Sequence, residues 1–179
     1  VTARREAEEA SRERLQFETL IADLSSRFVN LPPGEVDREI EDAQRRVCDV
    51  LGVDLSALWE GTPTAQAPLR LTHFYSAQEG LLPPMRGMSA GEYFPWLQAE
   101  MLAGRTVRAS SLDDLPREAS LDRDNLRLFG VRSNLTLPLS AGGASPMAAL
   151  GFTATRAERE WPEALVKRLR LVGQVFGNA

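Results

Sequence analysis

The chain of 179 residues carries a net charge of −4, with 43 % hydrophobic and 26 % charged residues. This balance is typical of a globular protein with one buried core, and its slight acidity argues against nucleic-acid binding. A single cysteine, Cys48, excludes an internal disulfide and any metal site built from several cysteines. Because no apolar run is long enough to span a bilayer and no signal peptide opens the sequence, we expect a cytoplasmic location.

The start of the chain predicts one long helix, from about Thr2 to Val29, with a narrow apolar stripe. The stripe advances by four and three residues alternately, and only Arg14 interrupts it. This spacing is typical of helices that pair along a seam. The seam residues are Ala3, Ala7, Ala10, Phe17, Ile21, Leu24, Phe28 and Leu31. The apolar residues of the seam are all alanines in the first part of the helix, and alanines bury little surface. We therefore expect residues 1–14 to be a helical linker and residues 15–179 to form the domain.

A second amphipathic helix is predicted over residues 35–51, and Gly52 then provides the left-handed backbone that commonly ends a helix. The hydrophobic period next changes to two, which predicts strands. In the strand at 69–75, this alternation places His73 on the same face as Leu71 and Tyr75. The predicted strands are residues 55–60, 69–75, 106–109, 134–139 and 147–153, with a turn at 61–68, and the short helices between them are residues 94–102 and 120–129.

A last helix is predicted to begin near Pro162, a residue favoured in the first turn. It repeats the spacing of the first helix at Leu165, Leu169, Val172, Phe176 and Ala179. The order of elements favours an α+β fold, with an antiparallel sheet and helices mainly on one face.

Several strings of this sequence resemble GAF domains, the small-molecule sensor modules of bacterial signalling proteins. The resemblance covers roughly residues 15–179. It implies a central antiparallel sheet of about five to six strands, with the terminal helices on one face and short helices and loops on the other. The similar strings are Phe-Glu-Thr-Leu-Ile-Ala-Asp-Leu-Ser at 17–25, Leu-Gly-Val-Asp at 51–54, Gly-Val-Arg-Ser-Asn-Leu-Thr-Leu-Pro-Leu at 130–139 and Ala-Leu-Gly-Phe at 149–152.

The opening residues, Val-Thr-Ala-Arg-Arg at 1–5, resemble the end of a PAS domain. This second resemblance implies a multidomain sensor with a PAS domain upstream. Proteins arranged in this way include histidine kinases, diguanylate cyclases and transcriptional activators, and the sequence does not choose among these flanking domains.

The resemblance also implies a ligand pocket, lined by the segments between the second and the central strand. Pockets of this kind are mostly apolar with a few placed polar groups. The alternative is that these side chains only fill the core. The string typical of cyclic-nucleotide-binding GAF domains is absent, which argues against cyclic GMP and cyclic AMP. The pocket candidates are the apolar and aromatic Tyr93, Phe94, Trp96, Met101, Leu126 and Phe129, and the polar Arg132, Ser133, Asn134 and Thr136.

Cofactor and catalytic candidates are few. Cys48 lies near an apolar helix face, so we expect a buried structural thiol and no bilin attachment. His73, the only histidine, is more typical of a hydrogen-bonded strand residue than of a haem ligand. Asp122 and Asp124 are expected to be unburied and to charge the first turn of their helix. We identify no metal site and no catalytic group, so an enzyme is disfavoured.

These observations predict a non-catalytic sensory domain that binds an unknown small ligand and passes the signal along its terminal helices. We expect a homodimer through those helices, weakened by Phe17→Glu or Phe176→Glu. The alternative is a structural dimerisation module with a vestigial pocket. The expected helix residues are Phe17, Ile21, Leu24, Phe28, Leu165, Leu169, Val172 and Phe176.

Overall fold

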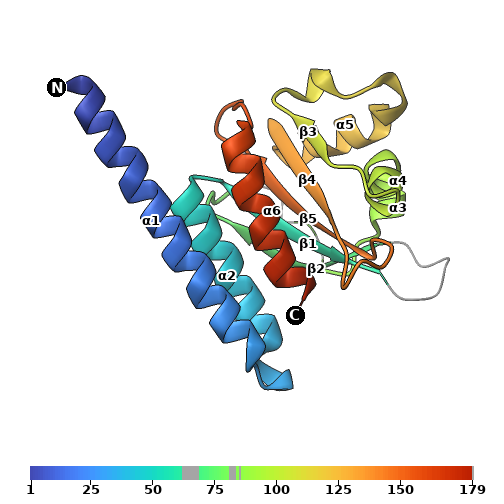
Figure 1. Cartoon of the computed structure of the whole chain (residues 1–179). Helices are drawn as coiled ribbons and strands as arrows, with labels where there is room; N and C mark the ends of the chain where they lie inside the picture. Colours follow the sequence, from blue (N-terminus) through green and yellow to red (C-terminus); the bar gives the residue numbers. More distant parts are fainter. Residues whose placement is uncertain (62–68, 81–83, 85, 179) are drawn as a thin grey trace.

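In the part of the chain that the structure describes, five antiparallel strands form one sheet in the order β2-β1-β5-β4-β3 (Figure 1). The computed structural model describes residues 1–61, 69–80, 84 and 86–178. The α+β fold with an antiparallel sheet is confirmed, whereas the predicted turn at 61–68 lies, apart from Gly61, outside the described residues. The strands are β1 (Leu55–Glu60), β2 (Arg70–Ser76), β3 (Val107–Ala109), β4 (Ser133–Leu139) and β5 (Ala148–Ala154).

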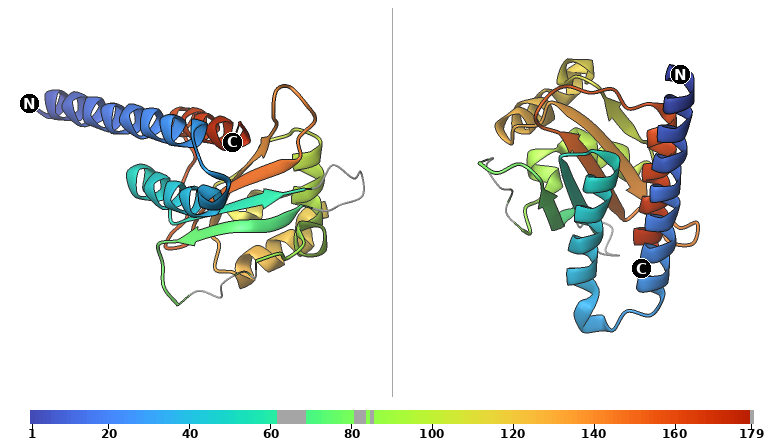
Figure 2. Two further views of the ribbon diagram at one scale, coloured as in Figure 1. Left: turned by 90° about the horizontal axis from the view of Figure 1, so that it is seen from below. Right: turned by 90° about the vertical axis from the view of Figure 1, so that its left-hand side faces the viewer.

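Helices cover both faces of the sheet, long ones on one side and short ones on the other (Figures 1 and 2). The long helices are α1 (Thr2–Val29), α2 (Val36–Leu51) and α6 (Glu163–Gly177). The short helices are α3 (Ala90–Tyr93), α4 (Pro95–Leu102) and α5 (Ser120–Leu128), and single 3₁₀ turns lie at Pro33–Glu35, Leu112–Asp114 and Arg117–Ala119. All predicted helices are present, and α3 is an additional one. Gly52 ends α2 with a φ of 65°, as its position predicted.

The larger seam residues of α1 and α6 form the core of the single chain. Phe17, Leu24, Leu169, Val172 and Phe176 are buried there, and Ile21, Phe28 and Leu165 pack against them half-buried. The rings of Phe28 and Phe176 pack edge to face, with their centroids 5.6 Å apart. Burial of these side chains therefore fixes α1 and α6 to the domain itself.

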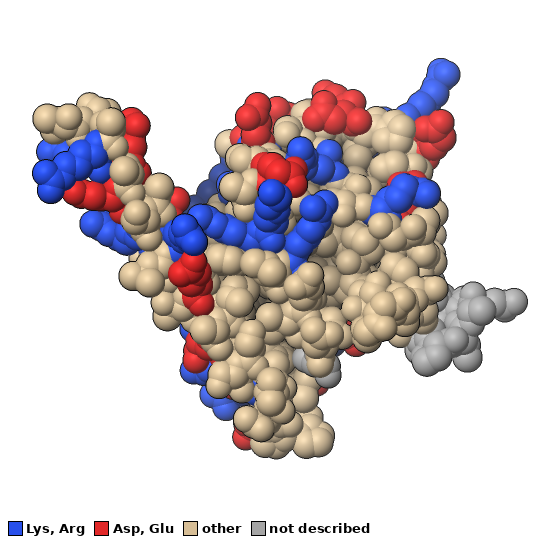
Figure 3. Space-filling model, in the orientation of Figure 1, with Lys and Arg blue, Asp and Glu red and all other residues tan. Residues whose placement is uncertain are grey.

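The N-terminal part of α1 has no such support. All of the first 16 residues are exposed, and this part of the helix stands clear of the body in Figure 2. Acidic and basic side chains both lie on it, as Figure 3 shows at the upper left. Ion pairs one turn apart, such as Arg4–Glu8 at 2.9 Å, contribute only a few tenths of a kcal/mol each, about 0.2–0.5. Residues 1–16 therefore form an exposed helical arm, and the alanine seam of this arm lies open to solvent in the described chain.

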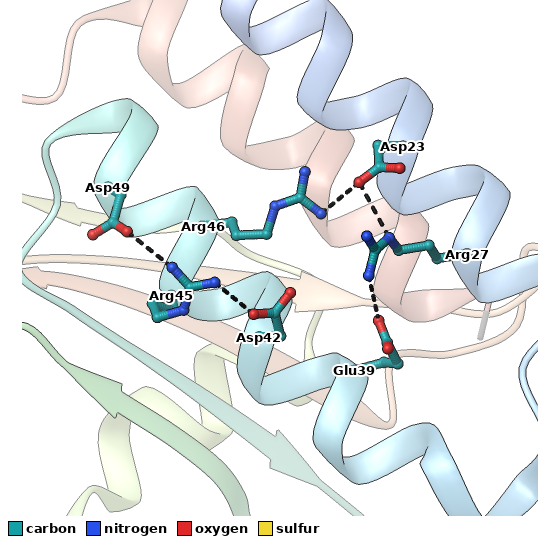
Figure 4. A network of polar contacts seen from close by, with 7 residues as sticks. All are labelled: Asp23, Arg27, Glu39, Asp42, Arg45, Arg46 and Asp49. Carbon is teal, nitrogen blue, oxygen red and sulfur yellow. Dashed lines mark hydrogen bonds and ion pairs between the residues drawn. The ribbon is translucent and has the colours of Figure 1, made fainter.

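An ion-pair network ties α1 to α2 (Figure 4). Asp23 Oδ2 of α1 lies 2.6 Å from Arg46 Nη1 of α2 and 3.2 Å from Arg27 Nε. Arg27 also reaches Glu39 of α2 at 3.5 Å. The Arg46 guanidinium beside Asp23 lowers the pKa of that carboxyl, and its charge and that of Arg27 act in the same direction. The two helices are thus held together by charge as well as by apolar contact.

A β-bulge in β2 changes which face its residues occupy. The register passes from Leu58 opposite His73 to Trp59 opposite Leu71, so Thr72 is the extra residue. Its hydroxyl donates to the Leu58 carbonyl at 3.2 Å. As a result, Leu71 faces the short helices, while His73 and Tyr75 face α2. The prediction that Leu71 and His73 share a face was wrong, because an alternating pattern does not register an inserted residue.

Candidate functional site

A cavity of about 350 Å³ lies between the sheet and the short helices. This volume is within the range, roughly 300–1,000 Å³, of pockets that hold small molecules. The cavity is on the face of the sheet opposite α1, α2 and α6, so the seam helices do not line it.

Small side chains in the central strands make the floor of the cavity hollow. The pairing of β1, β5 and β4 brings Ala57, Gly151 and Thr136 into one row. A Cβ built on Gly151 would meet nothing closer than 3.8 Å, so space for a side chain exists above this glycine. Gly151 lies in regular pairing on both sides. A glycine in such a strand, without a bulge and without close backbone, is typical of a place where a ligand approaches.

The neighbouring row of the floor is more polar. Pairing places Ser76, Leu55, Thr153 and Asn134 side by side across β2, β1, β5 and β4. The amide of Asn134 donates to the Thr136 hydroxyl at 2.8 Å. Among the described residues, the buried Oγ1 of Thr153 has no hydrogen-bond partner. The cavity therefore has one edge with hydrogen-bonding capacity beside an apolar centre.

Apolar side chains of the short helices form the roof. They include Phe94, Leu97 and Met101, together with Leu126 and Phe129. Phe94 contacts Trp59 edge to face at 5.8 Å and lies 6.3 Å from the ring of Phe129. Glu79 is the one charged residue among the described residues that line the cavity. A negatively charged group on a bound molecule would therefore find no basic side chain to pair with within the described lining.

Asp122 holds the roof in position. Its carboxylate accepts hydrogen bonds from the N–H groups of Leu97, at 2.8 Å, and Trp96, at 3.2 Å. These are free N–H groups of the first turn of α4, so a side chain of α5 caps another helix. Asp122 is fully buried, and this burial raises the pKa of its carboxyl. Asp122 lies in the first turn of α5 as predicted, but the prediction that it is unburied was wrong, because the pattern of α5 does not reveal which helix packs over it.

The structure brings six of the predicted pocket residues to the cavity: Phe94, Met101, Leu126, Phe129, Asn134 and Thr136. Tyr93 and Trp96 pack half-buried in the same apolar core without lining the described cavity wall. Arg132 precedes β4 and is exposed. The Ser133 hydroxyl donates to the Ser110 carbonyl at 2.6 Å and is not part of the cavity wall as described.

The floor residues Ala57, Gly151 and Thr153 were missed by sequence reasoning. Alternation along β1 and β5 shows that one face of each strand differs from the other, but it does not show which strands are neighbours or which face carries a cavity. The one available signal was Gly151 itself, an isolated glycine inside a strand pattern.

The other candidate groups lie away from the cavity. Cys48 of α2 is 2 % exposed in the core on the opposite face, and burial raises the pKa of its thiol. His73 has Nε2 2.9 Å from Asp37 Oδ1 and Nδ1 2.9 Å from Thr72 Oγ1, also on that face. Within the described ranges, no three or more His, Cys, Asp or Glu side chains gather as metal ligands would. None of the described helices is long and apolar enough to cross a membrane.

Comparison with known proteins shows that this chain has the GAF fold. No family model and no curated protein matches the sequence. Solved GAF domains match in structure. The phycocyanobilin-bound GAF domain of a cyanobacterial phytochrome has a TM-score of 0.70 at 14 % identity, covering 90 % of this chain and 91 % of that one. The GAF domain of an Acinetobacter phosphoenolpyruvate-protein phosphotransferase has a TM-score of 0.65 at 15 % identity, and the match covers 90 % of this chain and 88 % of that one.

A red/green cyanobacteriochrome in its red-light-absorbing state matches with a TM-score of 0.63 at 14 % identity, covering 79 % of this chain and 91 % of that one. Another matching GAF domain, from a cyanobacterial phytochrome, holds phycoerythrobilin, and a further matching structure holds biliverdin. The expectation that bilins could be set aside was therefore wrong. It rested on the position of Cys48, whereas the fold of this chain is shared with several proteins that bind bilins.

Proposed function

We propose that this chain is a non-catalytic sensory domain that binds a small molecule in the cavity between the sheet and the short helices. The hollow over Gly151, closed by the roof of α4 and α5, is the observation that carries the proposal. Bilins are among the ligands to be tested, since matching GAF domains hold them. A bilin here would be held without a bond to Cys48, because that thiol is buried on the opposite face of the sheet.

We further propose that ligand binding biases how α1 packs. Phe74 of β2 lines the cavity, and the next residue toward the bulge, His73, contacts Asp37 of α2. Arg46 of α2 in turn pairs with Asp23 of α1. A ligand can shift this arrangement only by binding one helix position better than another. The full protein would be a dimeric, multidomain sensor, with a PAS domain before α1 and an output domain such as a histidine kinase.

The cavity favours this proposal over a structural spacer with a vestigial pocket. A spacer has no need of a hollow, and filling one with side chains ordinarily stabilises a domain. The β5 glycine that keeps the hollow open is therefore better explained by a ligand. Gly151→Leu should fill the hollow with little strain, because its Cβ meets only ordinary contacts.

The test compares the wild type with Gly151→Leu and with Gly34→Leu as the matched control. A Cβ at Gly34 would meet nothing within 4 Å, and this residue lies in the 3₁₀ turn before α2 and does not line the described cavity wall. Native mass spectrometry would detect a retained molecule, and thermal shift would screen metabolites, phycocyanobilin and biliverdin. We expect a hit that the control keeps and Gly151→Leu loses. A panel without any hit, together with an unchanged melting temperature on filling, would favour the spacer.

A further inference from the structure

The polar groups of the cavity floor are not equally satisfied. The Ser76 hydroxyl donates to the Gln78 carbonyl at 3.0 Å, and the Asn134 amide donates to Thr136. Thr153 lies between them in the same row, 5 % exposed, and its Oγ1 has no partner among the described residues. Buried hydroxyls are nearly always hydrogen-bonded, so this group needs an explanation.

The space beside Thr153 matches this unsatisfied hydroxyl. Gly151 is two residues along β5, on the same face, and leaves the hollow next to Thr153 open. Rotation about χ1 between staggered positions exchanges the hydroxyl and the methyl group of a threonine, so the hydroxyl can be presented to a molecule that lies over Gly151. Thr153 can then donate to an acceptor at the edge of that molecule.

Charge limits what can be buried there. Within the described lining, Glu79 is the one charged residue, and residues 62–68, 81–83 and 85 contain no Lys, Arg, His, Asp or Glu in the sequence. An anionic group deep in the cavity would lose its hydration without gaining a cation. Any carboxylate of a ligand would therefore have to point out of the cavity.

Resting on the proposed function, we infer that the cavity takes a flat ring compound that is uncharged where it is buried and presents a carbonyl acceptor, such as that of a lactam, to the hydroxyl of Thr153. The ring lies over Gly151 beneath the apolar roof, and the carbonyl reaches the polar row of the floor. Thr153 is thus the residue that distinguishes a ligand with an acceptor edge from an apolar ring of the same shape.

Three probes of one size test this inference: 2-quinolone, which is a neutral lactam, naphthalene, which has no polar edge, and 2-naphthoate, which is an anion. Affinities would be measured by NMR titration of the labelled protein. We expect 2-quinolone to bind several-fold more tightly than the other two. Thr153→Val should lower the affinity for 2-quinolone by about two- to tenfold, as expected for one lost hydrogen bond, and should leave the affinity for naphthalene unchanged. Thr19→Val, at an exposed position of α1, is the matched control.

The variants separate failure of this inference from failure of the proposed function. If Gly151→Leu abolishes binding of 2-quinolone and naphthalene while Thr153→Val leaves their ratio unchanged, the cavity is a ligand site and the role of Thr153 is wrong. If Gly151→Leu leaves all binding unchanged, the cavity is not the site and both proposals fail. Equal affinity for 2-naphthoate, or no binding of 2-quinolone at millimolar concentration, overturns the inferred ligand class.

Discussion

The carboxylate of Asp122 in α5 accepts a hydrogen bond of 2.8 Å from the backbone N–H of Leu97 in the first turn of α4. This contact fixes the two helices that roof the cavity to each other. Its removal leaves one buried and one partly buried N–H group of α4 without their acceptor. The same carboxylate therefore stabilises the domain and shapes the roof of the proposed site.

Asp122→Ala should lower the free energy of unfolding by about 1–3 kcal/mol, the range for a lost helix cap and unsatisfied buried donors. Urea unfolding followed by circular dichroism measures this difference. Asp124→Ala serves as the exposed control in the same helix, because the Asp124 side chain is 74 % exposed. A loss below 0.5 kcal/mol, on the order of a surface substitution, would contradict the capping role.

The raised pKa of Asp122 predicts a pH dependence of stability. Because burial raises the pKa above its ordinary value of 3.8, the folded state holds this proton more tightly than the unfolded state. The contribution of protonated Asp122 to the free energy of unfolding is fully present below pH 3.8 and is lost as the pH rises through the folded-state pKa. Relative to Asp122→Asn, which does not titrate, the wild type should become less stable over this rise. A constant difference between the two proteins from pH 3 to 7 would show that the pKa is not raised.

The α1–α2 ion pair predicts the opposite trend at low pH. Arg46 and Arg27 lower the pKa of Asp23, so this contribution is present above the ordinary value of 3.8 and is lost as the pH falls through the lower folded-state pKa. Asp23→Asn should be less stable than the wild type at neutral pH by no more than about 1 kcal/mol, since the pair is partly exposed. The gap should close in acid. Unfolding at pH 7 and at pH 2.5 measures it, and a gap that widens in acid would contradict this assignment.

The dimer proposal calls for substitutions outside the core of the single chain. Phe17→Glu and Phe176→Glu place a charge where each side chain is buried, so we expect both to unfold the domain and to say nothing specific about association. Ala10 lies on the exposed alanine seam of α1, so Ala10→Glu places a charge on that seam. Ala22 is an exposed alanine of the same helix that lies off the seam, so Ala22→Glu is the control. Sedimentation velocity at high micromolar concentration should show a dimer that only Ala10→Glu weakens. A monomeric wild type at that concentration would refute seam pairing.

Cys48 should be unreactive in the folded protein. Its burial raises the pKa of the thiol, and the thiolate is the reactive form. Ellman's reagent is expected to modify Cys48 only as fast as the domain unfolds, and any bilin taken up should be released under denaturing conditions. A covalent adduct that survives denaturation would contradict the placement of this thiol behind the sheet.

Much of the fold could be predicted from local patterns. The apolar stripe through Phe17 and Leu24 predicted a helix with one buried side, and Gly52 predicted the end of α2. These features are encoded within a few residues of one another, where helix geometry alone decides which side chains share a face. The roof residues Phe94 and Phe129 were predicted in another way, because the resemblance to GAF domains implied a pocket lined by the segments between the second and the central strand.

What the sequence by itself determined is therefore the set of elements and the apolar face of each long helix. Only the tertiary structure decided that Asp122 caps α4, that a bulge at Thr72 turns His73 toward α2, and that Gly151 and Thr153 form the floor of a cavity. Each of these depends on pairing between segments far apart in the chain. Strand register and helix packing are set by the sum of many contacts, so no short stretch of sequence contains them.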